Sequence, residues 1–217
     1  MLSDQLKSRT ARAAVLLLVL MTGLFSSAYA LGPLDGEVGL DWWSAENDGW
    51  DDSFDTDTIN GFAEVWWDNK WGVKGQRYSS DLEDVGYEES EHLSIDLKRR
   101  FFSLTDNSFF AVGAGWEEID LDDAGSSSGF RITAEGRFGL GGTVYLYGMT
   151  SWLPELQDAG ARSDLEGQAF EAGVNFDPAP FVSLRLGFRR FKLNYNDATG
   201  GGSTESDGFI FGAGVHW

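Results

Sequence analysis

The sequence contains no cysteine, which excludes a disulfide framework, a thiolate metal site, a cysteine nucleophile and a lipid anchor on cysteine. Histidine is scarce, with two residues, so few sites could use an imidazole. Beyond the first thirty residues, no segment approaches the ~18 uninterrupted apolar residues of a transmembrane helix. If the rest of the chain enters a membrane, it is expected to do so with strands.

Residues 1–30 have the composition of a cleaved signal peptide. Lys7, Arg9 and Arg12 form a basic region, residues 13–25 are apolar, and residues 28–30 (Ala-Tyr-Ala) fit a small-x-small cleavage site. We therefore expect a signal peptide of residues 1–30 and a single domain of residues 31–217.

Basic residues are also scarce, with 16 Lys and Arg against 35 Asp and Glu and a net charge of −19. Removing the leader leaves 13 basic and 34 acidic residues, a net charge of about −21. Such a charge repels phosphate, so nucleic acid is excluded as a partner.

The abundant residues favour strands, because the chain has 28 Gly together with 9 Trp, 6 Tyr and 16 Phe. Ten segments alternate in polarity with a period of two. They are residues 36–44, 59–67, 70–79, 91–102, 108–118, 129–139, 142–152, 167–176, 181–195 and 207–217. Short turns and longer polar connections alternate between them, the first two long connections being residues 45–58 and 80–90. The pattern predicts an all-β domain of about ten strands.

Each segment has an apolar face and a polar face. The polar face is expected to carry a balanced charge network, with bulky residues such as Phe102 among the charges. The network comprises Glu37, Asp41, Glu64, Lys74, Asp96, Lys98, Arg100, Arg131, Glu135, Arg137, Glu171, Arg185 and Arg189. Two interpretations stay open for these charges: a narrow charged pore, or an ion-pair network that fills the barrel.

The closing stretch Gly208 to Trp217 (GFIFGAGVHW) places Phe209, Phe211 and Trp217 on one strand face. It resembles the last strand of Gram-negative outer-membrane β-barrel proteins, and aromatic residues near the segment ends resemble their interfacial girdles. The resemblance implies a single antiparallel up-and-down transmembrane barrel of about ten strands, with eight also possible, in the cell outer membrane. It also implies contact with outer-membrane lipid and lipopolysaccharide, and recognition of Trp217 by the barrel-assembly machinery. A soluble barrel with the charged face outward is the alternative.

The long connections are acidic. Carboxylates at this density can collect Ca²⁺ or Mg²⁺, although a solvated acidic surface is the alternative. The candidate ligands are Asp48, Asp51, Asp52, Asp55, Asp57, Asp120, Asp122 and Asp123.

Three functions are compatible with these features, and none requires a cofactor. The first is a non-enzymatic barrel that is structural or a narrow porin-like passage for small solutes. The second is a surface-interaction protein whose acidic loops bind divalent cations, lipopolysaccharide or a partner. The third is a lipid A-modifying hydrolase, because His92 and Ser94 have a His-x-Ser spacing that resembles the dyad of lipid A deacylases.

Overall fold

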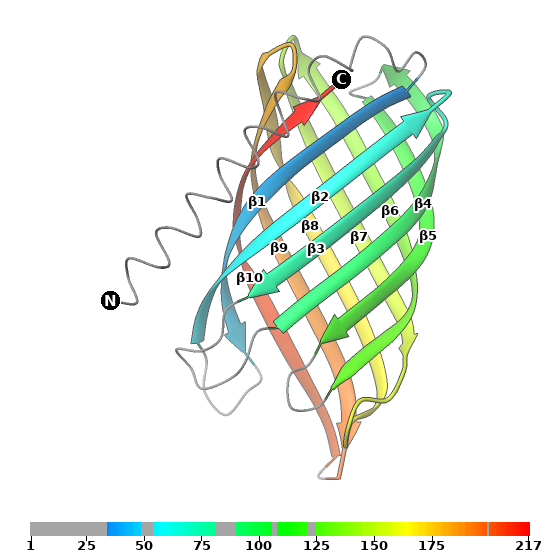
Figure 1. The fold of residues 1–217 in the computed structure, drawn as a ribbon, viewed down its shortest axis with the longest axis vertical. Coiled ribbons are helices and arrows are strands. Elements are labelled where there is room, and N and C mark those ends of the chain that lie inside the picture. Colours follow the sequence, from blue (N-terminus) through cyan, green and yellow to red (C-terminus); the bar gives the residue numbers. More distant parts are fainter. Residues whose placement is uncertain (1–33, 49–53, 81–89, 106–107, 121–124, 199) are drawn as a thin grey trace.

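The computed structural model describes residues 34–48, 54–80, 90–105, 108–120, 125–198 and 200–217. These residues form ten strands (Figure 1). The strands are β1 (Leu34–Asp48), β2 (Phe54–Trp67), β3 (Trp71–Ser80), β4 (Ser90–Thr105), β5 (Ser108–Asp120), β6 (Ser126–Gly141), β7 (Val144–Leu156), β8 (Ser163–Ala179), β9 (Val182–Asp197) and β10 (Gly200–His216).

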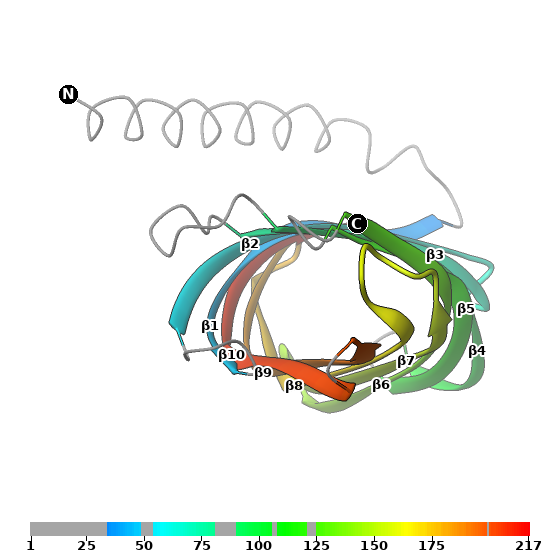
Figure 2. The ribbon, with the colours of Figure 1, turned by 90° about the horizontal axis from the view of Figure 1, so that it is seen from below.

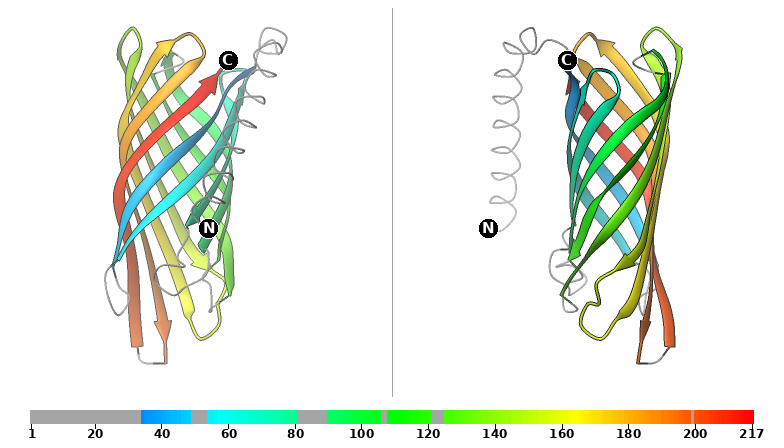
Figure 3. Two further views of the ribbon diagram at one scale, coloured as in Figure 1. Left: turned by 60° about the vertical axis from the view of Figure 1, so that its left-hand side comes forward. Right: turned by 90° about the vertical axis from the view of Figure 1, so that its right-hand side faces the viewer.

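The strands pair antiparallel with their neighbours in sequence, and β1 pairs with β10 to close the barrel. Figures 2 and 3 show this closed ring from one end and from two sides. The closing seam continues to Trp217, whose N–H donates to the Gly36 carbonyl at 3.0 Å. No described segment forms an apolar helix long enough to cross a membrane. We call the end with Leu34 and Trp217 the terminal end and the opposite end the distal end.

The outer surface of the barrel is a belt of exposed apolar side chains. Ile59, Ile95, Phe130, Leu186 and Phe209 are all well exposed, and each alternates along its strand with a buried inward-facing residue. An apolar outer surface and a polar interior exclude the soluble alternative, which requires the reverse arrangement.

The strands run further at the distal end than the polarity pattern predicts. The expected connection 45–58 is partly strand, because Ala45 pairs with Thr56 and Glu46 with Asp55. The expected connection 196–206 is mostly strand as well, because β9 continues to Asp197 and pairs there with Gly200, the first residue of β10. Beyond the apolar belt the strands keep their backbone pairing but face water on the outside, so the alternation that marks a strand is lost there.

The assignment of Phe102 to the inner face is wrong. The pairing of β4 with β5 shifts between Arg100 and Phe102, so the strand gains a residue and Phe102 turns outward, where it is 60% exposed. A β-bulge reverses the facing of every residue beyond it.

Candidate functional site: the barrel lumen and its terminal cavity

The structure places every residue of the expected charge network on the inner face of the barrel. All of them are buried except Arg137, whose side chain is 12% exposed. Glu117 joins them, so the acids Glu37, Asp41, Glu64, Asp96, Glu117, Glu135 and Glu171 balance the bases Lys74, Lys98, Arg100, Arg131, Arg137, Arg185 and Arg189. Such a balance is required because an unpaired charge inside a barrel is costly.

The first cluster of the network lies toward the terminal end. Lys98 Nζ contacts Glu64 Oε1 and lies 2.6 Å from Glu135 Oε2. The Arg137 guanidinium joins the same two carboxylates, at 2.8 Å from Glu64 and 3.1 Å from Glu135. Two cations and two carboxylates from β2, β4 and β6 thus form one compact group.

A second cluster spans the other side of the lumen. Arg185 lies 3.2 Å from Asp41 and 3.9 Å from both Glu37 and Glu171. Arg189 donates to the Tyr78 hydroxyl at 2.7 Å and lies 3.4 Å from Glu171. These contacts join β1, β3, β8 and β9 across the barrel.

Arg131 holds the third cluster, toward the distal end. Its Nη1 donates to Glu117 Oε2 at 2.9 Å. Its Nε lies 3.1 Å from Asp96 Oδ1, although the two are not aligned for a hydrogen bond. Two buried carboxylates, those of Asp96 and Glu117, therefore lie against this single guanidinium.

Inward-facing glycines provide the room for these side chains. A Cβ added at Gly212 would collide with the Asp41 carboxylate, and one at Gly72 would lie 2.6 Å from the Trp66 ring. The glycine spacing of the closing strand therefore has a packing cause: bulky groups of neighbouring strands lie against its backbone.

An apolar cluster fills the distal part of the lumen, and the polarity pattern did not reveal it. It comprises Trp43, Ala45, Tyr78, Ile119, Leu153, Leu156, Leu165, Ala169, Phe191, Leu193 and Ile210, with Tyr195 packed against it. Its signal was present in the strand period, because Ile210 and Leu193 fall on the inward positions of their strands. The other part of the cluster lies beyond the expected segments, in stretches that the polarity pattern predicts as connections: Ala45, Ile119, Leu153, Leu156 and Leu165.

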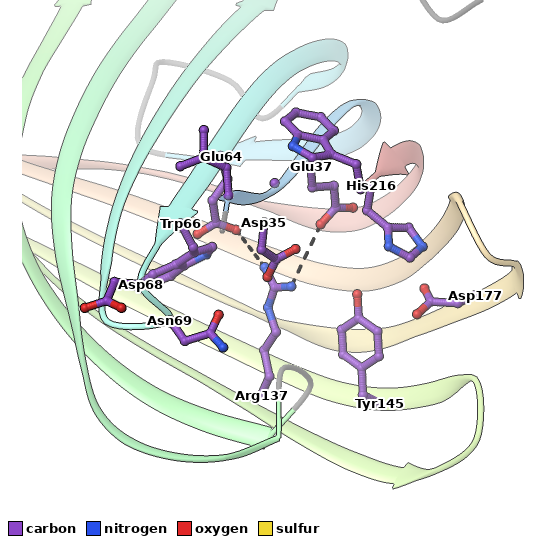
Figure 4. Close-up of a pocket in the computed structure, with 13 residues that line it drawn as sticks. Asp35, Glu37, Glu64, Trp66, Asp68, Asn69, Arg137, Tyr145, Asp177 and His216 are labelled. Carbon is purple, nitrogen blue, oxygen red and sulfur yellow. Dashed lines mark hydrogen bonds and ion pairs between the residues drawn. The ribbon is translucent and has the colours of Figure 1, made fainter. Parts of the chain in front are cut away.

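A cavity of about 590 Å³ opens at the terminal end. In Figure 4, Trp66, Asp68 and Asn69 lie on one side and Asp177 and His216 on the other, with Arg137 between them. Burial raises the pKa of Asp177 above its ordinary value, and the nearby His216 opposes that shift. The ion pairs of Arg137 with Glu64 and Glu37 lie at the inner limit of the cavity.

The possible catalytic pair lies inside the barrel. His92 Nδ1 is 3.8 Å from Glu117 Oε1, and the ring packs edge-on against Phe191 at 4.9 Å between centroids. Ser94 is buried on the same inner face. No hydrogen bond joins these two described side chains, so the nucleophile–base contact of a hydrolase is not formed.

The candidate cation ligands do not form a metal centre in the part of the chain that the structure covers. Asp48, Asp55, Asp57 and Asp120 lie near the distal ends of their strands. Asp51, Asp52, Asp122 and Asp123 fall outside the described residues, as does the expected signal peptide. Among the described side chains, no group of three His, Asp or Glu residues could hold a metal ion.

Comparisons with known proteins support the architecture. No family model matches the chain, and no curated protein matches it. The solved outer-membrane protease OmpT from Escherichia coli is similar, with a TM-score of 0.52 and 11% identity over 86% of this chain and 97% of that chain.

Two other solved structures are similar to this chain at lower TM-scores. Neisserial surface protein A (NspA) has a TM-score of 0.45 and 11% identity over 84% of this chain and 97% of that chain. Ail, the attachment invasion locus protein of Yersinia pestis, has a TM-score of 0.38 and 11% identity over 85% of this chain and 99% of that chain. At such identities a likeness shows the fold and no activity. The closed ten-stranded barrel, its exposed apolar belt and the likeness to OmpT show that this chain has the fold of a Gram-negative outer-membrane β-barrel.

Proposed function

We propose that the protein is a non-conducting, non-enzymatic barrel of the outer membrane, exported by a leader at residues 1–30, with a lumen that serves as a structural plug. The observation that carries this proposal is the burial of the inward-facing side chains. Lys98 and Asp96 are each 1% exposed, and Ile119, Leu153 and Leu165 are 0% exposed. A water-filled pore would leave such side chains accessible.

The order in which the cavity, the ion pairs and the apolar cluster follow one another along the barrel axis supports the same conclusion. A solute that enters the cavity at the terminal end meets the paired charges of Arg137, Glu64 and Lys98, and then the apolar cluster. Passage would require breaking buried ion pairs, and each unpaired buried charge costs about 3–5 kcal/mol. The filled lumen therefore favours the structural role over the porin-like one.

Planar-bilayer conductance tests this proposal. We expect the protein purified from outer membranes, shown to be folded by a heat-modifiable gel band, to insert without producing current steps. A reference channel added to the same bilayer verifies that the membrane can report conductance. Reproducible steps from the folded protein would refute the plug and restore the porin-like function.

The distal end favours a second candidate, a surface-interaction protein. Its described carboxylates are Glu46, Asp48, Asp55, Asp57, Glu91, Glu118, Asp120, Glu155, Asp158, Asp164, Glu166, Asp197, Glu205 and Asp207, and its described cations are Arg77, Arg162, Arg190 and Lys192. Arg77 and Arg190 are neutralised by Glu91 and Glu205, each at 2.6 Å. An acidic surface of this kind suits a cationic partner, or divalent cations that bridge it to lipopolysaccharide.

A further inference from the structure

Lys70 and Arg99 lie outside the lumen and differ from the paired outer cations Arg77 and Arg190. Arg77 and Arg190, toward the distal end, lie in ion pairs. Lys70 and Arg99 lie at the terminal end, both exposed, and neither forms an ion pair with another described residue. Two solvated cations therefore lie close together on the outer surface of a strongly acidic protein.

The backbone brings these two cations side by side. Arg99 is in register with Trp71, the first residue of β3, and the Arg100 N–H donates to the Lys70 carbonyl at 2.7 Å. The nearest carboxylate in the sequence, that of Asp68, lines the terminal cavity and forms no ion pair with another described residue.

Aromatic rings flank the guanidinium. Its central carbon lies 5.3 Å from the Trp71 ring and 5.5 Å from the Phe101 ring, both within cation–π range. Trp71 is 39% exposed and Phe101 is 65% exposed, so the rings leave the outer side of Arg99 open. This packing orients the planar fork while its donors stay available.

Apolar surface surrounds this group. The bulge of β4 turns Phe102 outward, and Leu104 and Leu140, near the terminal-end limits of β4 and β6, are also exposed. This surface continues the lipid-facing belt of the barrel to its edge. At that edge a membrane changes from acyl chains to headgroups, where aromatic and basic side chains are both favourable.

The terminal end faces the periplasm, because short turns and both chain termini lie there in outer-membrane barrels. We propose that Lys70, Arg99, Trp71 and Phe101 form a binding site for the phosphate of an anionic phospholipid in the periplasmic leaflet. Arg99 engages the phosphate oxygens with its fork, Lys70 adds a point charge, and the rings and Phe102 contact the glycerol and acyl region.

The expected selectivity follows from the charges. Each cation near a membrane surface favours an anionic lipid about five-fold. Phosphatidylglycerol should therefore be retained over phosphatidylcholine, whose own cation offsets its phosphate. The lipid-binding site requires that the barrel lies in the outer membrane, as the proposed function states, but it does not require a closed lumen. A conducting barrel would therefore refute the plug and leave the lipid site unaffected.

Native mass spectrometry of the full protein, released from micelles that contain either lipid, tests the site. We expect the folded protein to retain phosphatidylglycerol preferentially. Arg99→Gln or Lys70→Gln should lower that retention about five-fold and the double variant further. The matched control is Arg190→Gln with Lys192→Gln at the distal end, which should change nothing.

Three results would overturn the site: equal retention of both lipids, unchanged retention in the double variant, or an equal loss in the distal control. If the Gln variants fail to show a heat-modifiable band, Arg99→Lys keeps the charge and tests the fork. It should retain phosphatidylglycerol selectivity with weaker binding. Complete loss of that selectivity, or binding as strong as in the unmodified protein, would contradict the role assigned to the guanidinium.

Discussion

At the scale of single residues, the barrel depends on buried charges that are each held by few partners. Arg131 illustrates this, because Asp96 and Glu117 both lie against its guanidinium. Arg131→Met should lower the free energy of unfolding by about 3–5 kcal/mol, since both carboxylates lose their cation inside the barrel. Urea titration of the folded gel band measures the effect.

Arg77 is the matched control, because it also binds one carboxylate closely, Glu91 at 2.6 Å, but with its side chain 61% exposed. Arg77→Met should change the same free energy by less than about 1 kcal/mol. Adding Asp96→Asn and Glu117→Gln to Arg131→Met should restore part of the loss. Equal effects at Arg131 and Arg77 would contradict the assignment of the inner pairs as structural.

At the scale of the strand, β10 shows why an element of a filled barrel needs glycine. Its inward positions Gly208, Gly212 and Gly214 face neighbours that leave no space for a Cβ. Gly212→Ala should destabilise the barrel by about 1–3 kcal/mol, because the methyl group overlaps the Asp41 carboxylate. The refolding yield and the urea midpoint both report this change.

Gly61→Ala on β2 provides the comparison, because a Cβ there would lie 3.6 Å from Leu40, an ordinary contact. We expect it to be neutral or to stabilise by about 0.5–1 kcal/mol, as alanine is favoured over glycine in a strand. If Gly212→Ala is equally harmless, the close approach of Asp41 to β10 is not present in the folded protein.

At the scale of the whole molecule, charge is divided between a neutral, buried lumen and an acidic distal end. Salt screens exposed charges over about 10 Å at 0.1 M and 3 Å at 1 M but hardly reaches buried pairs. The midpoint of heat modification should therefore stay constant or rise with sodium chloride, as repulsion between the distal carboxylates is relieved. A clear fall would mean that the lumen pairs are accessible to water.

The same titration tests the surface-interaction candidate. Calcium chloride at matched ionic strength should raise the midpoint beyond the sodium chloride value if the distal carboxylates bind the ion, because a ligand of the folded state stabilises it. Identical curves for the two salts would count against a divalent-cation function.

The strand number, the antiparallel barrel and the facing of most residues were predictable from the sequence. The reason is that lipid on one side and a packed lumen on the other impose a period of two on every crossing strand. Ile95 and Leu186, for example, occupy the outward positions that this period predicts. It fails where the lipid ends, so the distal extensions of β1 and β10 were predicted as loops.

Only the tertiary structure decided how the inner face is used. The period places Arg185 and Asp41 on the same face but not within 3.2 Å of each other, because that distance depends on which strands meet across the barrel. It also cannot show that Phe191 and Leu165, far apart in sequence, close the distal lumen. The bulge that turns Phe102 outward and the approach of Lys70 to Arg99 likewise depend on the register between strands, which an alternating sequence leaves open.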